Sequence, residues 1–460
     1  MTALDNPLET AFATVFQPAF QPAAPPPFNA MVDTGPIPLV APTAVESQRL
    51  FAAAPEPWIT ANLDAHLARF GPLPLADYPK GAGKRLLVEK VSRAGLRGRG
   101  GAGFPMAEKM MLINDSRRGA IVLANGCEGD PSSGKDRELL RRAPHLVLDG
   151  IAMAAHALGA REAVLALHSG SPLTAVLANA LNEREGDPVA VELAEMPPGF
   201  VASESTALVN TLNSGDPRPT GVRTSNKGVR GRPTLVSNVE TLAHLALIAR
   251  FGDDWYRAAG TPHSPGTTLV TVSGAVNRPG VHEVELGLPI SDVLELAGGE
   301  TEPLRAVLIG GLGGSWLPIT DALELPLAHE TCADVGIELG VAALIALPAR
   351  ACGIAETAAV LRHLADAGAG QCGPCLFGLP AIATDFDALA MGAADRDLLP
   401  RLQRRLGVIP GRGACSHPDG AVRLAATALH TFADDVAAHR SGRPCAATVL
   451  GPWTPLEHRP

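Results

Sequence analysis

The sequence of 460 residues lacks any apolar run long enough to cross a membrane. A membrane helix needs about 18 consecutive apolar residues, whereas the stretch from Val341 to Leu347 is short and ends at Pro348. The N-terminal residues, MTALDNPLETAF, also lack the basic start and continuous apolar segment of a secretion signal. We therefore expect a soluble, cytoplasmic protein without a membrane span.

An excess of positive charge is lacking as well, since 38 basic residues face 47 acidic ones and the net charge is −9. The basic residues are scattered apart from a cluster at Arg93, Arg97 and Arg99, which argues against a nucleic-acid partner. The seven cysteines form no even, short-spaced framework, which favours a reducing compartment, where grouped thiols more often bind metal than form disulfides. No Ser-His-Asp or His-Glu-x-x-His arrangement supports hydrolysis, and we predict no catalytic side chain.

Composition and hydrophobic periodicity divide the chain into five parts. Strand and helix patterns alternate in the largest part, as in α/β domains, and strands around the turn NRPG then predict a small β-grasp unit. Later segments such as AETAAVLRHLADAG have helical periodicity and predict a bundle. The predicted parts are a proline-rich, partly ordered arm (1–55), an α/β domain (56–255), a β-grasp domain (256–345), a helical domain (346–440) and a tail (441–460).

A glycine-rich loop, GLRGRGGAGFPMAEK, occupies residues 95–109. Gly98, Gly100 and Gly103 fit the pattern G-x-G-x-x-G of dinucleotide-binding folds, but that pattern alone is weak evidence. A Rossmann fold requires a strand directly before the loop, whereas the preceding KRLLVEKVSRAG has the periodicity of an amphipathic helix. The sequence therefore argues against a Rossmann site.

The loop nevertheless suits a phosphorylated cofactor. Glycine lets backbone N–H groups approach a phosphate without obstruction by Cβ atoms, and Arg97 and Arg99 add positive charge. The alternative is a flexible surface loop, against which the flanking Phe104 and Pro105 argue.

The loop resembles, almost letter for letter, the FMN-binding loop of the flavoprotein subunit of respiratory complex I, the 51 kDa type, and of its relatives in NAD-linked hydrogenases and formate dehydrogenases. NGCEGDPSSGKDREL resembles the family's NADEGEPGTFKDREL, VASESTALVNTL resembles CGEETALMNSL, and GRPTLVSNVETLAHL resembles GKPTTINNVETLAN. The similarity covers most of the chain from about Leu63 onward. It implies an α/β FMN-binding domain, a soluble-ligand-binding β-grasp domain and a C-terminal helical iron–sulfur bundle.

The resemblance also implies which residues hold FMN, with NADH as the substrate. Asparagine and threonine side chains can hydrogen-bond the ribityl chain or the ring edge, and glycine N–H groups can hold the phosphate. Phe104 matches a position that stacks on adenine in the family. The predicted cofactor residues are Gly98, Arg99, Gly100, Gly101, Gly103, Phe104, Lys109, Asn125, Glu128, Asp130, Glu204, Asn238 and Thr241.

The NADH half of the implied pocket departs from the family pattern. Leu112 stands where a second stacking aromatic is expected, and Thr220 and Arg223 replace a lysine and a phenylalanine. Ser205 and Asp130 replace two glutamates. Each lost stacking or hydroxyl contact typically costs about 1 kcal/mol or more. The changes are either neutral drift, with Arg223 stacking on the adenine, or a change of electron donor.

Cysteines near the C-terminus indicate a metal centre. Cys372 and Cys375 have C-x-x-C spacing and Cys415 follows in GRGACSHPDGA, a pattern typical of iron–sulfur ligands. These three match ligands of the family motif ESCGKCTPCR and its late cysteine, which implies a 4Fe-4S cluster. Ala369, however, occupies the place of the fourth ligand, and alanine cannot bind iron.

The missing fourth ligand leaves several alternatives open. A cluster can keep a labile fourth site or take Cys352, and zinc can bind the three cysteines together with His417. The thiols can also be ordinary buried side chains of a bundle that has lost its cluster. Cys127, Cys332 and Cys445 have no grouped partners in the sequence and are predicted to be structural, although Cys127 can tune a nearby flavin.

The resemblance implies an NADH:acceptor oxidoreductase subunit that passes a hydride from NADH to FMN and then single electrons to an iron–sulfur centre and a partner. Such subunits work beside other redox subunits, usually a small iron–sulfur subunit, and can be peripheral to a membrane complex. Two alternatives remain. One keeps both cofactors but takes electrons from ferredoxin or another protein, and the other is a cofactor-depleted scaffold of a redox complex.

Overall fold

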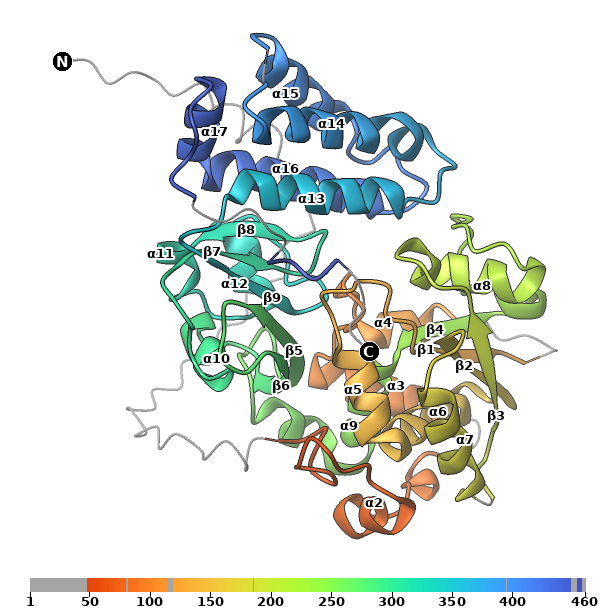
Figure 1. Cartoon of the computed structure of the whole chain (residues 1–460). Helices are drawn as coiled ribbons and strands as arrows, with labels where there is room; N and C mark the ends of the chain where they lie inside the picture. The colour runs from red at the N-terminus through yellow and green to blue at the C-terminus, as the bar shows by residue number, and fades with distance from the viewer. Residues whose placement is uncertain are drawn as a thin grey trace, which may run out of the picture. The chain divides into compact units, whose positions relative to one another are not determined.

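The computed structural model describes residues 48–79, 82–113, 119–184, 186–393, 395–447 and 453–456, and contains two sheets surrounded by helices (Figure 1). Most of the predicted arm, residues 1–47, lies outside these ranges. Its last part is not an extended segment, because Leu50 and Phe51 are buried and their N–H groups donate to the carboxylate of Glu283 at 2.9 to 3.2 Å. Apolar burial and these hydrogen bonds hold residues 48–55 against the folded core.

The first sheet has four parallel strands in the order β3-β2-β1-β4. Each crossover between its strands includes at least one helix, as parallel strands require. The elements of this α/β domain are α2 (Leu63–Phe70), η1 (Leu75–Asp77), α3 (Gly83–Ala94), α4 (Met106–Met111), β1 (Ile121–Asn125), α5 (Lys135–Arg142), α6 (Pro144–Leu158), β2 (Glu162–His168), α7 (Leu173–Asn182), β3 (Ala190–Met196), η2 (Val201–Ser203), α8 (Ser205–Ser214), η3 (Val229–Gly231), β4 (Thr234–Asn238) and α9 (Val239–Arg257).

Both faces of this sheet are covered by helices. Because side chains alternate along a strand, Val122 and Ala124 of β1 pack into the core formed with α3, α6 and α9, whereas Ile121 and Leu123 face a smaller core with α8. Helices α6 and α9 approach so closely that a Cβ on Gly150 would lie 2.0 Å from the carbonyl oxygen of Leu242. The apolar run of β1 is therefore that of a fully buried central strand.

The second sheet has five strands in the order β6-β5-β9-β7-β8 and confirms the β-grasp prediction. Its central strand β9 is buried along its whole length, pairs in parallel with β5 and pairs antiparallel with β7. The sheet runs past the predicted boundary at residue 345. Its elements are β5 (Thr267–Gly274), β6 (Gly280–Glu285), α10 (Ile290–Leu296), β7 (Leu304–Ile309), β8 (Ser315–Pro318), α11 (Ile319–Ala322), α12 (His329–Asp334) and β9 (Ala343–Pro348).

The C-terminal helices pack on the face of the second sheet that carries Ala306, Leu308 and Ile345. Contact is made through Trp316 of β8, whose ring lies 5.2 Å from that of Phe432. None of the helices in the described ranges is long and apolar enough to span a membrane. The helices are α13 (Gly353–Asp366), a π-helical turn η4 (Pro374–Gly378), α14 (Leu379–Ala390), α15 (Leu398–Val408), α16 (His417–Thr431) and α17 (Ala433–Arg440).

Candidate functional site

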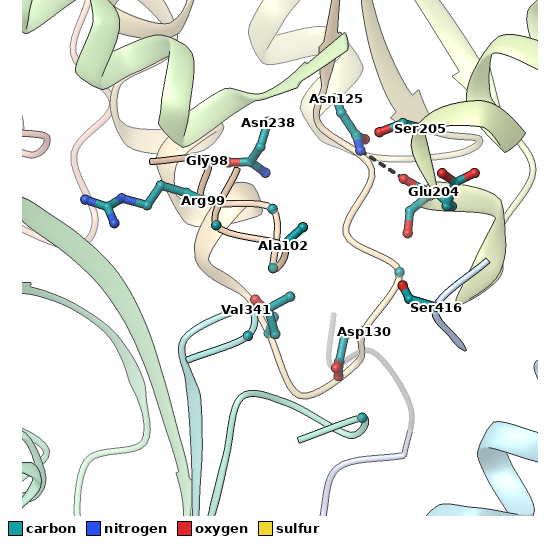
Figure 2. Close-up of a pocket in the computed structure, with 18 of the residues that line it drawn as sticks. Gly98, Arg99, Ala102, Asn125, Asp130, Glu204, Ser205, Asn238, Val341 and Ser416 are labelled. Carbon is teal, nitrogen blue, oxygen red and sulfur yellow. Dashed lines mark hydrogen bonds between the residues drawn. The ribbon is translucent and has the colours of Figure 1, made fainter. Parts of the chain in front are cut away.

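A cavity of about 590 Å³ opens at the carboxyl ends of β1 and β4 (Figure 2). These two strands are neighbours, and their last residues, Asn125 and Asn238, are paired in register. The chain leaves β1 toward β2 on one side and returns as β4 on the other, so the cavity lies at a topological switch point, where open α/β sheets bind ligands. Its volume falls within the range of about 300–1,000 Å³ typical of cofactor sites.

The structure brings every predicted cofactor residue to this one cavity. The glycine loop forms one wall, and segments that follow β1, precede α8 and follow β4 form others, although they are far apart in the sequence. Cys415 also lines the cavity, whereas Cys372 and Cys375 do not. The lining residues from the prediction are Gly98, Arg99, Gly100, Gly101, Gly103, Phe104, Lys109, Asn125, Glu128, Asp130, Glu204, Asn238 and Thr241.

The glycine loop is a closed turn between α3 and α4. The N–H of Gly98 donates to the carbonyl of Phe104 at 2.9 Å, which closes the loop at its base. Gly101 and Gly103 have φ values of 103° and 61°, a region that L side chains rarely adopt. A Cβ on Gly103 would also lie 3.1 Å from Cε1 of His329, so the loop conformation depends on glycine there.

The loop fits a phosphate group. Residues 100–103 line the cavity, and three of the four are glycines, so no Cβ shields the backbone at those three positions. Backbone N–H groups of such a turn can form an anion-binding site. FMN, which the family resemblance implies, carries such a phosphate, and the donor set therefore fits it.

Arg99 does not supply its charge to the cavity, and that expectation is wrong. Figure 2 shows its side chain directed away from Ala102 and Asp130. The guanidinium is buried, donates to the hydroxyl of Tyr256 at 3.1 Å and to the carbonyl of Thr267 at 3.0 Å, and lies 3.8 Å from the carboxylate of Glu240. Its backbone N–H donates to Oγ1 of Thr241 at 2.8 Å, so Arg99 and Thr241 hold the loop in place.

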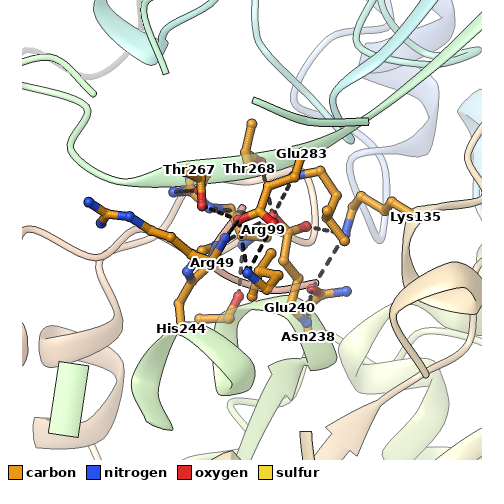
Figure 3. A network of polar contacts seen from close by, with 12 residues as sticks. Arg49, Arg99, Lys135, Asn238, Glu240, His244, Thr267, Thr268 and Glu283 are labelled. Atoms are coloured by element: carbon orange, nitrogen blue, oxygen red, sulfur yellow. Dashed lines mark hydrogen bonds and ion pairs between the residues drawn. The ribbon is translucent and has the colours of Figure 1, made fainter. Parts of the chain in front are cut away.

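Lys135 is a buried cation at the cavity that the sequence analysis missed, and two carboxylates pair with it. Lys135 lines the cavity, and its ammonium group lies 2.7 Å from Asp136 and 3.0 Å from Glu240 (Figure 3). Burial would lower the pKa of Lys135, but these two carboxylates raise it above its usual value, so the group stays charged. Lys135 lies within the segment NGCEGDPSSGKDREL and Glu240 within GRPTLVSNVETLAHL. Both segments resemble the family's motifs, so the resemblance could have pointed to these two residues.

The two asparagines have protein partners as well. Asn125 donates to the carbonyl of Ser203 at 2.9 Å, and Asn238 donates to Asp136 at 2.6 Å while its Oδ1 caps α9. A carboxamide has two donor hydrogens and two acceptor positions, so each retains capacity toward a ligand. Both residues therefore position neighbouring segments at the cavity as well as facing it.

The acidic side chains Glu128, Asp130 and Glu204, which line the cavity, already accept hydrogen bonds from other residues of the chain. Asp130 accepts from the N–H of Ser132 at 2.9 Å and from the N–H of Leu312, in the β-grasp domain, also at 2.9 Å. Burial raises the pKa of the Asp130 carboxyl. Glu128 accepts from backbone N–H groups at the start of α5, and Glu204 caps α8. Asp130 thus ties two domains together beside the cavity.

The residues that differ from the family pattern in the NADH half of the pocket lie either in the cavity lining or outside it. Ser205 lines the cavity, whereas Leu112, Thr220 and Arg223 do not. Phe104 lines it and is 41% exposed, which leaves an aromatic face open to a ligand. Phe200 and His417 also line it, with ring centroids 5.1 Å apart, and no sequence pattern pointed to Phe200.

The three predicted metal ligands lie near one another. Beyond the larger effect of burial, the Cys372 and Cys415 thiols raise the pKa of Cys375, and the Cys372 thiol raises that of Cys415. Cys375 lies at the C-terminal end of α13, since its Sγ would be 3.5 Å from a Cβ on Gly368. Because the thiolates of a cluster bind different iron atoms, they need not be as close as the ligands of a single ion.

One alternative for the cluster is wrong. Cys352 cannot complete this group, because it precedes α13, whose 14 residues at 1.5 Å each place it about 20 Å from the helix end beside Cys375. Cys445, which has no grouped partner in the sequence, has two in the structure, because its Sγ lies within 4.8 Å of ligand atoms of both Cys352 and His439. No sequence pattern pointed to this group, since its three residues are brought together only by the packing of α13 and α17.

Comparison with known families identifies three regions of the chain. Residues 91–247 match the Nuo51 FMN-binding domain, residues 269–315 match the SLBB domain, and residues 355–439 match the NADH-ubiquinone oxidoreductase-F iron-sulfur binding region. The first match lies within the parallel α/β domain, the second covers the first part of the second sheet, and the third covers most of the C-terminal helices.

Known proteins are similar over most of the chain. The F subunit of the NADH-quinone oxidoreductase of Escherichia coli is 32% identical over 378 residues, 76% of this chain and 83% of the relative. The equivalent protein of Mycobacterium tuberculosis is 29% identical over 380 residues, with 78% and 85% covered. An NADP-reducing hydrogenase subunit of Solidesulfovibrio fructosivorans is 28% identical, with 79% and 78% covered.

A solved structure of an NAD⁺-reducing NiFe hydrogenase in the H₂-reduced state has a TM-score of 0.72 and 32% identity. It covers 80% of this chain, and this chain spans 64% of that hydrogenase chain. The fold and the matched regions define an oxidoreductase subunit with an FMN-binding domain and an iron–sulfur binding region. The chain belongs to the family of NADH-quinone oxidoreductase F subunits. It is also similar to an NADP-reducing hydrogenase subunit and to a chain of an NAD⁺-reducing hydrogenase.

Proposed function

We propose that this chain is an electron-transfer flavoprotein subunit that takes a hydride from NADH onto FMN and passes single electrons to an iron–sulfur centre and a partner. The observation that carries the proposal is that one cavity is lined by every predicted cofactor residue and by Cys415, a predicted cluster ligand. The flavin and cluster sites therefore share a wall.

The residues that would hold FMN are those of the glycine loop and the strand ends. The backbone N–H groups of residues 100–103 would bind the phosphate, and Lys135, which Asp136 and Glu240 already pair, would hold the wall beside it. Asn125 and Asn238 would orient the remainder of the cofactor. FMN supplies the conversion of a two-electron donor's reducing equivalents into single-electron steps.

Around the cofactor site, burial and nearby carboxylates shift the pKa values of cavity-lining groups. Burial lowers the pKa of the cavity-lining Lys109, with Glu204 acting in the opposite direction. Burial, together with nearby carboxylates including Glu204, raises the pKa of the Cys415 thiol. Glu204, which lines the cavity, therefore acts on both Lys109 and Cys415.

Cys372, Cys375 and Cys415 would supply three thiolate ligands of a 4Fe-4S cluster, and Ala369 leaves the fourth cysteine position of the family motif without a ligand. The exposed Leu376 and Phe377, which follow Cys375 directly, would face a smaller iron–sulfur subunit. The proposed location is cytoplasmic, with any membrane association made through partner subunits.

A second candidate keeps both cofactors but takes electrons from ferredoxin or another protein. Two residues favour this candidate over NADH. The carboxylate of Asp130 already accepts hydrogen bonds from Ser132 and Leu312. Ser205 has a side chain too short to replace a hydroxyl-binding glutamate. Thr220 and Arg223 lie outside the cavity lining, so they do not restore the lost contacts.

The absorption spectrum of anaerobically purified, iron-reconstituted protein tests these candidates. Bleaching of the flavin band by NADH supports the first proposal. Bleaching by reduced ferredoxin or dithionite, but not by NADH, supports the second. Protein that contains no flavin and does not take it up overturns both and leaves a scaffold role.

A further inference from the structure

We propose that Cys352, His439 and Cys445 bind a single zinc ion at a second metal site, separate from the predicted cluster. One Sγ or ring nitrogen from each of the three residues lies within 4.8 Å of the others. In the described part of the chain, no other group of three cysteine, histidine or carboxylate side chains has this spacing.

The histidine is oriented as a ligand. Nδ1 of His439 lies 3.0 Å from the carbonyl of Leu389 and donates to it, because a carbonyl can only accept. A neutral imidazole in this tautomer leaves the lone pair of Nε2 for a metal, and Nε2 lies 3.7 Å from Sγ of Cys352. Metal-binding histidines are commonly fixed in this way, with the second ring nitrogen bonded to a carbonyl.

Cys352 is positioned as a ligand by the N-terminus of α13. The N–H of Ala355 points at its Sγ from 3.4 Å, which fixes the direction of the side chain. Asp435 of α17 accepts from the N–H of Gly353 at 3.1 Å, so a hydrogen bond holds α17 against the start of α13. Two of the ligands are thus placed by groups that do not need the metal.

Cys445 is brought to the site by the turn that ends α17. The N–H of Arg443 donates to the carbonyl of Ala438, and that of Gly442, with φ 65°, donates to the carbonyl of His439, both at 3.0 Å. This pair of bonds is a Schellman motif with glycine at the left-handed position. It turns the chain back so that Cys445 faces the last turn of its own helix.

Two thiolates and an imidazole favour zinc among the divalent ions, and zinc prefers four ligands in a tetrahedral arrangement. Cys445 is partly exposed, so a water molecule can complete the set. The ion would fasten residues 441–447 and α17 to the junction between β9 and α13. Its role would be structural, since the site lies at the opposite end of α13 from Cys375.

The test is the zinc content of the full-length protein, purified and dialysed under reducing, anaerobic conditions, for the wild type and a set of variants. Cys445→Ala removes the most exposed ligand. His439→Asn keeps a donor toward Leu389 but removes the ligand nitrogen. Cys332→Ala removes a buried thiol of the β-grasp domain and is the matched control. Cys372→Ser removes a predicted ligand of the cluster instead.

We expect one tightly bound zinc per chain in the wild type, in Cys332→Ala and in Cys372→Ser, and at least about tenfold weaker zinc binding in the other two variants. Zinc should raise the melting temperature of the wild type and not of Cys445→Ala, whose metal-free melting temperature serves as the folding control. Zinc that is lost in Cys372→Ser but kept in Cys445→Ala would place the ion at the cluster cysteines and overturn the proposal. A Cys352–Cys445 disulfide without zinc in the anaerobic protein would overturn it as well.

Discussion

Asn125 and Asn238 end two adjacent parallel strands in register, and each anchors the polypeptide segment that forms a wall of the cavity. Asn125 ties the segment after β1 to the turn before α8 through Ser203. Asn238 joins the start of α9 to Asp136 of α5. The cavity thus depends on a pair of carboxamides at the switch point of the sheet, where neither side chain can be replaced by an apolar one without loosening a wall.

Asn238→Ala should therefore weaken FMN binding more than it destabilises the fold. Loss of the cap on α9 costs about 1 kcal/mol, and loss of the bond to Asp136 leaves the cavity wall less ordered. We expect at least about a tenfold increase in the FMN dissociation constant, measured by flavin fluorescence titration. Asn62→Ala, which removes the cap of α2 away from the cavity, is the control and should cost similar stability with unchanged flavin binding.

Gly103→Ala should remove flavin through the shape of the loop. The residue has φ 61° and its Cβ would meet His329, so alanine costs about 1 kcal/mol or more and displaces the N–H groups that line the cavity. Gly159→Ala is the control, because its φ is 64° and its Cβ would meet nothing within 4 Å. Flavin content after purification should fall in the first variant only, and equal flavin content in both would contradict the proposed phosphate site.

The sequence predicted the α/β and β-grasp architecture and the cavity lining well, because these depend on strand periodicity and on contiguous motifs. It failed where a side chain's direction or a distant packing contact decides the outcome. Arg99 looks like a phosphate ligand in the loop, yet a buried carboxylate on α9 draws it inward. Cys445 looks solitary, yet the turn after α17 places it beside Cys352 and His439.

Ser205→Glu should improve the use of NADH, because Ser205 lines the cavity at the family's glutamate position. A carboxylate hydrogen bond to a ligand hydroxyl is worth about 1.5 kcal/mol or more, so we expect roughly a tenfold rise in kcat/KM for NADH. The measurement is steady-state reduction of ferricyanide by the reconstituted protein. Ser214→Glu at the other end of α8 is the control, and an equal effect of both variants would show that charge alone is responsible.

Ala369→Cys should complete the cysteine set of the cluster. Three thiolates leave one iron of a cluster exposed to loss, whereas four hold all of them. We expect iron content after aerobic purification to rise from at most about three to about four atoms per chain, as measured by mass spectrometry. Ala367→Cys, two residues earlier, is the control. Iron that binds to neither variant would indicate that the bundle has lost its cluster.

His329→Gln should change the pH dependence of stability in a defined direction. Burial, followed by the positive charges of Arg99 and Arg97, lowers the pKa of His329 from 6.5 to about 4. Between these values the unfolded chain binds a proton that the folded chain does not, so His329 costs stability as the pH falls through this window, by up to about 1.4 kcal/mol per pH unit. The free energy of unfolding of the wild type does not show this loss by itself as the pH is varied. Burial raises the pKa of Glu356 to about 7, and that group stabilises the fold as the pH falls.

The difference between the variant and the wild type isolates the histidine, since Glu356 contributes equally to both. We expect the free energy of unfolding of His329→Gln, relative to the wild type, to rise between pH 7 and pH 5, as measured by urea denaturation at each pH. A relative free energy that stays constant over this range would mean that the pKa of His329 is the same in the folded and the unfolded chain. The imidazole could not then lie in the buried position against Gly103 that helps shape the glycine loop.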